Sequence, residues 1–211
     1  MRPYLTFAIA KGRLAAYAVD ALTAAGASCE EMRGKSRKLI FYDEENKYRF
    51  FLAKASDVPT YVEHGAADIG IVGSDTLTEE QRDLYEVADL GFGKCSIVAA
   101  GPPEAEKLYR SGNNIRVTTK YPGIASDFFN RMRRQTIEII KLNGSVELGP
   151  KAGLSDLIVD IVETGDTLRE NGLVIFDEIC QVSARMVVNR VSIKMESERI
   201  NELIKKLKAE G

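Results

Sequence analysis

Residue types that can bind a sugar phosphate gather in one short stretch of the chain. In order, they are Asp160, Glu163, Thr164, Gly165, Asp166 and Thr167. A glycine-containing loop of this kind aims backbone N–H groups and hydroxyls at one point, which suits a phosphate. Asp160 precedes the loop and is our candidate for the sugar hydroxyls. An ordinary strand-to-helix turn explains the loop equally well, so the loop alone leaves both interpretations open.

The flanking pattern predicts the elements that would position this loop. Leu157–Val162 is an apolar run broken only by Asp160, which is typical of a buried strand. Thr167–Asn171 has helical composition, and Gly172 is placed to end that helix. The stretch is therefore predicted to be a strand, a tight loop and a short helix.

A second phosphate-facing arrangement is predicted near the N-terminus. Leu5–Ala10 reads as a strand, and an alanine-rich helix is expected from about Leu14 to Ala25. Lys11, Gly12 and Arg13 lie between them. Because a helix N-terminus favours anions, two cations placed there are unfavourable for stability, and this indicates a functional role.

Two further segments carry charged candidates with structural alternatives. Arg37 belongs to a basic run, which is usually a solvated loop, although an anion-binding role is also open. Asp75 follows a small-residue strand and lines the predicted site, or else Ser74 and Asp75 are only helix caps.

Composition excludes several classes of function. The net charge of −2 provides no overall basic field for nucleic acid or a membrane. Three widely spaced cysteines favour reduced thiols in a cytosolic protein over a disulfide framework or a zinc site. His64, the single histidine, is interpreted as structural because it stands at a helix end. Neither a signal peptide nor a membrane span is expected.

Strands alternate with helices along the chain, which predicts an α/β protein with mixed, largely parallel sheets. We expect two lobes. Residues 1–93 with 180–211 form the first lobe, and residues 94–179 form the second and carry the phosphate loop. A cleft between the lobes is expected to receive the basic turn from one side and the loop from the other.

The stretch from Glu147 to Leu168 resembles the signature of the ATP phosphoribosyltransferase family. The matching positions are Glu147, Gly153, Ser155, Ile158, Asp160, Ile161, Thr164, Gly165, Thr167 and Leu168. Shorter motifs along the whole chain resemble the family as well, among them Lys11–Leu14, Asp57–Gly65 and Thr119–Pro122.

This resemblance implies a reaction and a fold. ATP and phosphoribosyl pyrophosphate (PRPP) would give phosphoribosyl-ATP and pyrophosphate, with magnesium carried by the substrates. The fold would be two-lobed and similar to type II periplasmic binding proteins. The chain resembles the short form of the family, which works with a regulatory subunit similar to histidyl-tRNA synthetase. A homodimer of the catalytic subunit is also expected.

The resemblance also implies roles for individual residues. Lys11, Arg13 and Arg37 would supply cations to the pyrophosphate. Asp160 and the loop would hold the ribose 5-phosphate, although the signature leaves the position of Glu163 free. ATP or the lining of the cleft is assigned to Gly12, Asp75, Thr119, Lys120 and Tyr121.

Three alternatives compete with this reading. A signal peptide would favour a two-lobed solute-binding protein without catalysis, but none is recognised here. A phosphoribosyltransferase for another base is disfavoured by the first-lobe motifs rather than by the loop. A purely structural subunit is disfavoured by the presence of Lys11, Arg13 and the loop together.

Overall fold

A computed structural model of the chain describes residues 3–34, 38–112 and 114–209. The chain divides into two compact units, residues 1–93 with 183–211 and residues 94–182. The second boundary was predicted at residue 180, three residues before the observed boundary at residue 183. Strand β10 (Val174–Val182) continues through Cys180 and pairs with β6 (Cys95–Gly101) as far as Val182, which therefore belongs to unit 2.

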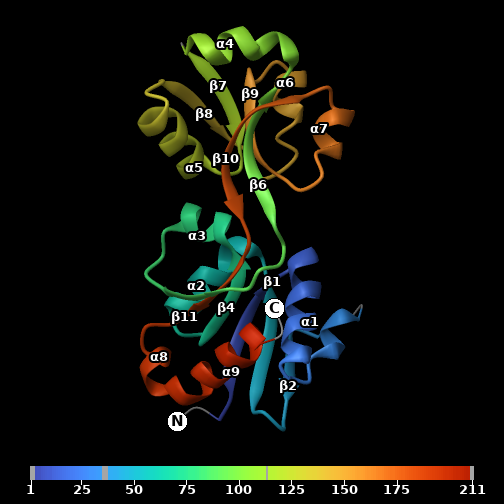
Figure 1. The fold of residues 1–211 in the computed structure, drawn as a ribbon, viewed down its shortest axis with the longest axis vertical. Helices are drawn as coiled ribbons and strands as arrows, with labels where there is room; N and C mark the ends of the chain where they lie inside the picture. The colour runs from blue at the N-terminus through green and yellow to red at the C-terminus, as the bar shows by residue number, and fades with distance from the viewer. Residues whose placement is uncertain (1–2, 35–37, 113, 210–211) are drawn as a thin grey trace. The chain divides into compact units, whose positions relative to one another are not determined.

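Unit 1 is a three-layer α/β unit (Figure 1). Its described strands are β1 (Leu5–Ala10), β2 (Ile40–Asp43), β3 (Tyr48–Ala53), β4 (Ile69–Gly73), β5 (Tyr85–Asp89) and β11 (Ala184–Val188), in sheet order β2-β3-β1-β4-β11-β5. Its described α-helices are α1 (Arg13–Ala24), α2 (Val58–Glu63), α3 (Ser74–Glu80), α8 (Ser192–Met195) and α9 (Ser197–Ala209). Short 3-10 turns cover Glu30–Arg33 and Ala55–Asp57.

The central strand β1 explains why both faces of this sheet are covered. Leu5, Phe7 and Ile9 enter one core, which α1 and α9 also line, whereas Ala8 and Ala10 enter the core that α2 lines. Every residue of β1 is buried. Burying a side chain such as Phe7 stabilises the fold by roughly 1.5–3 kcal/mol.

Unit 2 repeats the layered plan (Figure 1). Its described strands are β6, β7 (Ile115–Thr119), β8 (Ile137–Lys141), β9 (Leu157–Val162) and β10, in sheet order β10-β6-β9-β7-β8. Its described helices are α4 (Glu106–Ser111), α5 (Pro122–Ser126), α6 (Leu148–Lys151) and α7 (Asp166–Glu170), with a 3-10 turn at Pro103–Ala105 and a π-helical segment at Asp127–Met132.

The prediction of an α/β protein with mixed sheets is confirmed, but the prediction that they are largely parallel is wrong. Four of the nine strand pairings among the described residues are parallel and five are antiparallel. The antiparallel pairings are those of the β2–β3 hairpin and those made by the strands β6, β10 and β11, which lie near the unit boundaries in the sequence.

Two elements of unit 2 are locally irregular. Two β-bulges in β10 keep this strand paired with β6 across Asp177 and Glu178. The helix that begins at Pro122 becomes π-helical after Ser126, and there Phe128 and Phe129 are buried, whereas Met132 is 71% exposed.

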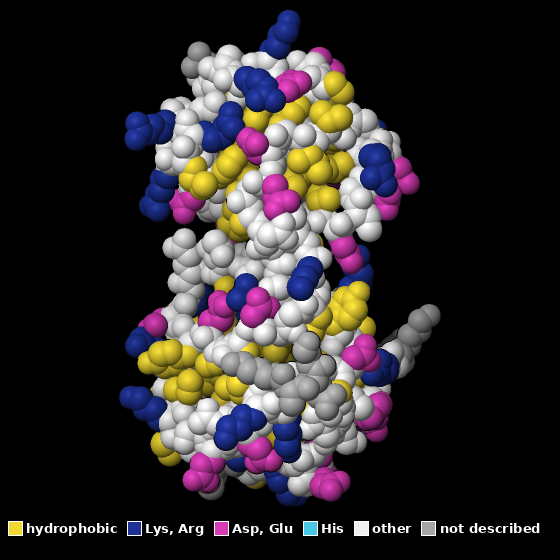
Figure 2. Space-filling model, viewed as in Figure 1, with side chains coloured by type: hydrophobic (Ala, Val, Ile, Leu, Met, Phe, Trp, Pro, Cys, Tyr) yellow, Lys and Arg dark blue, Asp and Glu magenta, His cyan; other side chains and the backbone are white. Residues whose placement is uncertain are grey.

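The charge distribution, the helices and the cysteines bear on the classes of function that the composition excludes. Basic and acidic side chains are interspersed over the face seen in Figure 2, as a net charge of −2 leads one to expect. Among the described residues, no helix is both long and apolar enough to cross a membrane. Cys29, Cys95 and Cys180 form no disulfide bond, and of these three only Cys29 is buried.

Candidate functional site

The basic turn of unit 1 follows the carboxyl end of β1. Lys11 donates its backbone N–H to the Ala53 carbonyl at 2.8 Å, and α1 begins at Arg13. Gly12 adopts φ 96° and ψ −152°, a conformation that is essentially restricted to glycine. Lys11 and Arg13 are exposed, and the first turn of α1 carries no acidic residue. This edge is therefore positively charged.

Asp75 lies at the same edge of the sheet. β1 and β4 are parallel neighbours, so Lys11 and Ser74 follow adjacent carboxyl ends. Helix α3 begins at Ser74 after Gly73, and no side chain caps it, so the cap interpretation of Ser74 and Asp75 is wrong. Ser74 accepts a hydrogen bond from the Ser183 N–H through its Oγ at 3.3 Å instead. Arg37 lies outside the described residues.

The predicted phosphate loop of unit 2 has the expected order of strand, tight loop and helix. Gly165 has φ 78°, in the left-handed region that glycine adopts without strain. Thr164 Oγ1 donates to Asp166 Oδ2 at 2.6 Å, and Arg169 forms an ion pair with the same carboxylate. Helix α7 begins at Asp166, one residue before the predicted start, and Asp166 therefore lies in its first turn.

A pocket of about 440 Å³ adjoins this loop. Glu163, Thr164, Gly165 and Arg169 line it on one side, and apolar side chains such as Leu173 line the other. Thr167 is exposed on the first turn of α7. The loop thus presents hydroxyls, backbone and charge to an accessible space within unit 2.

Asp160 is the strongly perturbed carboxyl of this unit. It lies near the carboxyl end of β9, in register with Val98 of β6. The pKa of Asp160 is raised to about 6, mainly by burial and to a smaller extent by the nearby Glu147 carboxylate, while the hydrogen bond from the Ile161 N–H and the charge of Lys120 act in the opposite direction. A half-buried carboxyl held at such a cost is a candidate functional group.

The turn after β7 reaches the same edge, because β7 and β9 are parallel neighbours. Thr119 is fully buried, and its hydroxyl donates to the Val159 carbonyl at 2.7 Å and accepts from the Tyr121 N–H at 2.8 Å. The Tyr121 side chain is 4% exposed. These two side chains therefore support the fold, whereas Lys120 is exposed, with Nζ 5.6 Å from the Tyr121 ring centroid.

Sequence reasoning missed two residues at this edge. Glu147 precedes α6 and influences Asp160 electrostatically, and its signal was its position at the start of the family signature. Arg169 donates to the Thr164 carbonyl at 3.4 Å and pairs with Asp166. Its signal was its isolation as a basic residue in an acidic segment.

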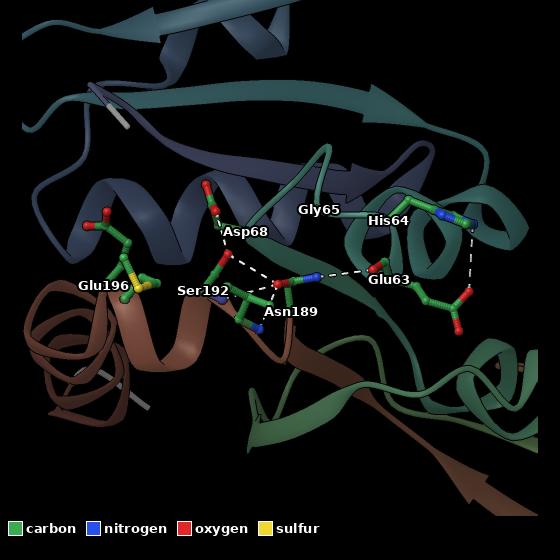
Figure 3. A pocket seen from close by; sticks show the side chains of 9 residues that line it. Glu63, His64, Gly65, Asp68, Asn189, Ser192 and Glu196 are labelled. Atoms are coloured by element: carbon green, nitrogen blue, oxygen red, sulfur yellow. Dashed lines mark hydrogen bonds and ion pairs between the residues drawn. The ribbon is translucent and has the colours of Figure 1, made fainter. Parts of the chain in front are cut away.

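A separate pocket of about 380 Å³ lies at the opposite end of the unit 1 sheet (Figure 3). Asp68 accepts hydrogen bonds from the Thr6 N–H at 2.8 Å and from Ser192 Oγ at 2.6 Å, and Asn189 binds the end of α2. His64 is the C-cap residue of α2, with Nε2 4.0 Å from Glu63 Oε2. These contacts favour a structural role for this pocket.

Comparisons with known proteins identify the family of this chain. The family model described as ATP phosphoribosyltransferase matches residues 54–209. The ATP phosphoribosyltransferase of Lachnoclostridium phytofermentans is 61% identical over 206 residues, covering 97% of this chain and 96% of that relative.

Solved structures extend the comparison to the fold. The ATP phosphoribosyl transferase (HisG:HisZ) complex from Thermotoga maritima contains a chain with 36% identity and a TM-score of 0.81, with 97% of each chain covered. The alkanesulfonate-binding protein SsuA from Xanthomonas axonopodis pv. citri shares the fold alone, with 11% identity, a TM-score of 0.63 and coverage of 98% and 72%. The predicted fold similar to periplasmic binding proteins is thereby confirmed. From the family match and the close relatives, the chain belongs to the ATP phosphoribosyltransferase family.

Proposed function

We propose that the two sheet edges bind different halves of PRPP. The loop Thr164–Thr167 binds the ribose 5-phosphate, and Asp160 binds the ribose hydroxyls. Lys11, Arg13 and Arg37 bind the pyrophosphate that leaves. The single observation that carries this assignment is the loop itself, in which Gly165 with positive φ turns the chain from β9 into α7 beside an open pocket.

The reaction of the family transfers the phosphoribosyl group of PRPP to nitrogen 1 of the adenine of ATP. The lone pair of that nitrogen attacks the anomeric carbon, and the bond from this carbon to the pyrophosphate oxygen breaks. Because the ring nitrogen is unprotonated at neutral pH, no strong base is needed. The enzyme has to align the two substrates and stabilise the growing charge on pyrophosphate.

Magnesium fits this scheme as an ion that enters with the substrate. Among residues 3–34, 38–112 and 114–209, no group of three or more His, Cys, Asp or Glu side chains is placed to hold a metal. Magnesium commonly binds through one or two carboxylates together with substrate phosphates. When bound, the ion offsets negative charge on the leaving pyrophosphate, and Asp160 is the carboxylate available to it beside the ribose.

We assign the remaining candidate groups of the two edges to ATP and to the walls of the site. Asp75 and Gly12 belong to the edge of unit 1, and Lys120 belongs to that of unit 2. Thr119 and Tyr121 act through the backbone of their turn, since their side chains are buried. Glu163 and Asp166 flank the phosphate through their backbone groups.

We also propose that this chain is a short-form catalytic subunit of the cytoplasm. Its partner would be a regulatory subunit similar to HisZ, and the catalytic subunit itself would be a homodimer. The HisG:HisZ complex of the Thermotoga maritima relative supports this partner class. Co-expression with a HisZ-like chain should yield a co-purifying complex that histidine inhibits. Separate elution of the two chains would contradict the partner assignment.

A direct assay tests the reaction. The full chain, with and without the regulatory subunit, is mixed with ATP, PRPP and magnesium, and a pyrophosphatase removes the pyrophosphate. We expect mass spectrometry to detect phosphoribosyl-ATP, and omission of PRPP to abolish it. A product from GTP but not from ATP would instead identify a phosphoribosyltransferase for another base. PRPP binding without any product would support a non-catalytic binding protein.

A further inference from the structure

The segment that carries the phosphate loop is strongly acidic. Between residues 152 and 184 the sequence contains one basic residue, Arg169. The same segment contains seven acidic residues: Asp156, Asp160, Glu163, Asp166, Glu170, Asp177 and Glu178. Arg116 and Arg133 pair with Asp156 and Asp177. Asp160, Glu163 and Asp166 lie in the loop or just before it, so a phosphate dianion that enters there meets like charges, which disfavour binding. Some group has to reduce that repulsion.

Arg169 is bonded to the loop at two points. Its Nη1 donates to the Thr164 carbonyl at 3.4 Å, and its Nη2 pairs with Asp166 Oδ1. The other oxygen of Asp166 accepts from Thr164 Oγ1 at 2.6 Å. Arg169 therefore neutralises the carboxylate that lies inside the loop, and it fixes the loop backbone at the same time.

The ion pair between Arg169 and Asp166 contributes little to the stability of the fold. The Arg169 and Asp166 side chains are 69% and 60% exposed, and ion pairs this exposed add little to the stability of a fold. Helix α7 has only five residues, so its macrodipole offers little compensation to a phosphate. The hydrogen bond from Thr164 and the positive charge of Arg169 both lower the pKa of Asp166, so this carboxyl stays ionised.

We propose that Arg169 is a positioning residue for PRPP, which neutralises Asp166 so that the loop accepts the 5-phosphate. This inference rests on the proposed role of the loop. Arg169 acts on the substrate through Asp166, and the sequence pairs the internal acid of the loop with a base three positions later on the same helical face. The 5-phosphate does not react, so the effect belongs to PRPP binding rather than to the chemical step.

The test is a charge-rescue experiment on the full chain, assayed with its regulatory subunit. Arg169→Gln should raise the KM for PRPP about fivefold at low ionic strength, with the KM for ATP unchanged. The increase should shrink as added salt screens the exposed charges. Adding Asp166→Asn should restore the KM for PRPP to within about twofold, because the unneutralised carboxylate is then absent.

Two comparisons complete the experiment. Arg110→Gln is the matched control, since Arg110 pairs with Glu106 on another short helix of unit 2 and its side chain is 68% exposed. Arg169→Lys keeps the charge and should have a smaller effect than Arg169→Gln. Calorimetric titration with PRPP and magnesium should reproduce the order of the KM values.

The outcomes separate this inference from the proposed function. If Arg169→Gln behaves like Arg110→Gln, Arg169 has no role in PRPP binding. If the double variant is as impaired as Arg169→Gln, the guanidinium contacts phosphate directly, and the positioning role is wrong. If wild-type protein forms no product and binds no PRPP, the proposed function itself fails, whatever the variants show.

Discussion

The two candidate edges differ in their charge and in how they are held. In unit 1, Lys11 and Arg13 bracket a glycine ahead of a twelve-residue helix whose first turn has no acid. In unit 2, the loop before α7 is acidic and hydroxyl-rich, and bonds among Thr164, Asp166 and Arg169 connect it internally. One edge supplies cations, and the other supplies a shaped loop in which Arg169 pairs with Asp166.

This difference matches the unequal demands of the two ends of PRPP. Negative charge grows on the pyrophosphate as it leaves, so cations there stabilise the transition state more than the ground state. The 5-phosphate keeps its charge throughout, so contacts to it contribute equally to both states. Variants of the first edge should therefore lower kcat, and variants of the second should raise the KM for PRPP.

The largest expected effect belongs to the cationic edge. Arg13→Ala should lower kcat by about 100-fold, the range found when one electrostatic stabiliser is removed, while ATP affinity changes much less. Arg37→Ala has the same expectation from the family resemblance. Stopped assays give kcat, and calorimetry gives the dissociation constant for ATP.

Arg190→Ala is the control for this prediction. Arg190 is an exposed arginine of unit 1 that pairs with Asp83, away from the basic turn. Its kcat should equal that of the wild type. An Arg13→Ala enzyme with unchanged turnover would refute the pyrophosphate role and remove the contrast between the two edges.

Gly12→Ala should have the next largest effect. No heavy atom lies within 4 Å of a Cβ built at Gly12, so the cost is backbone strain at φ 96° rather than a clash. Such strain costs about 1–3 kcal/mol, or it is relieved by moving the turn. We expect the free energy of unfolding to fall by that amount and kcat to fall about tenfold.

Gly144→Ala gives the matched comparison, because a Cβ there also meets nothing within 4 Å and its φ lies outside the strained range. Its stability should stay within about 0.5 kcal/mol of the wild type in urea unfolding. Equal stability of the two alanine variants would show that the Gly12 conformation is not required.

The sequence predicted those features whose signals are local. The strands Leu5–Ala10 and Leu157–Val162 were predicted at the bounds observed for β1 and β9, because continuous apolar runs between turn residues identify buried strands. The loop between these elements was predicted from its turn-forming residues, whereas its assignment to a phosphate came from the family resemblance.

Features that depend on distant partners were not predictable. Strand direction depends on the chain path between the units, so the antiparallel pairing of β10 with β6 was missed. Thr119 was assigned to ATP or to the lining of the cleft, but its side chain is buried and donates a hydrogen bond to the neighbouring strand. Glu147 perturbs Asp160 across thirteen residues of sequence, which only the fold brings together.

At the loop of unit 2, Thr167→Val should raise the KM for PRPP about tenfold and leave kcat nearly unchanged. Valine keeps the shape of threonine but removes a hydroxyl that can donate to the 5-phosphate, and one hydrogen bond to a charged group is worth about 1.5 kcal/mol or more. Thr136→Val, at an exposed threonine of the same unit, is the control. Equal KM values for the two variants would exclude Thr167 from the phosphate site.

The smallest expected effect concerns the stability that Asp160 costs the protein. Its pKa is about 6 in the folded chain, against about 3.9 for an unfolded aspartate. Between these values the native state binds more protons than the unfolded state, so the contribution of Asp160 to stability falls as the pH rises from about 4 to about 6. Above pH 6 this loss is complete.

Asp160→Asn removes this titration, and we expect it to stabilise the protein by about 1 kcal/mol at pH 7.5. The full pKa shift would correspond to more, but the amide keeps part of the cost of burial. Urea unfolding should show a smaller difference in free energy of unfolding between the variant and the wild type at pH 5 than at pH 7.5. The contributions of all other titrating groups are the same in both proteins and cancel in this difference. The same variant should bind PRPP more weakly. An equal advantage at both pH values would show that the Asp160 charge is not the cause. If the variant is more stable but binds PRPP more weakly, the protein retains the Asp160 carboxylate for substrate binding at a cost in stability. That carboxylate precedes the loop in which Arg169 pairs with Asp166.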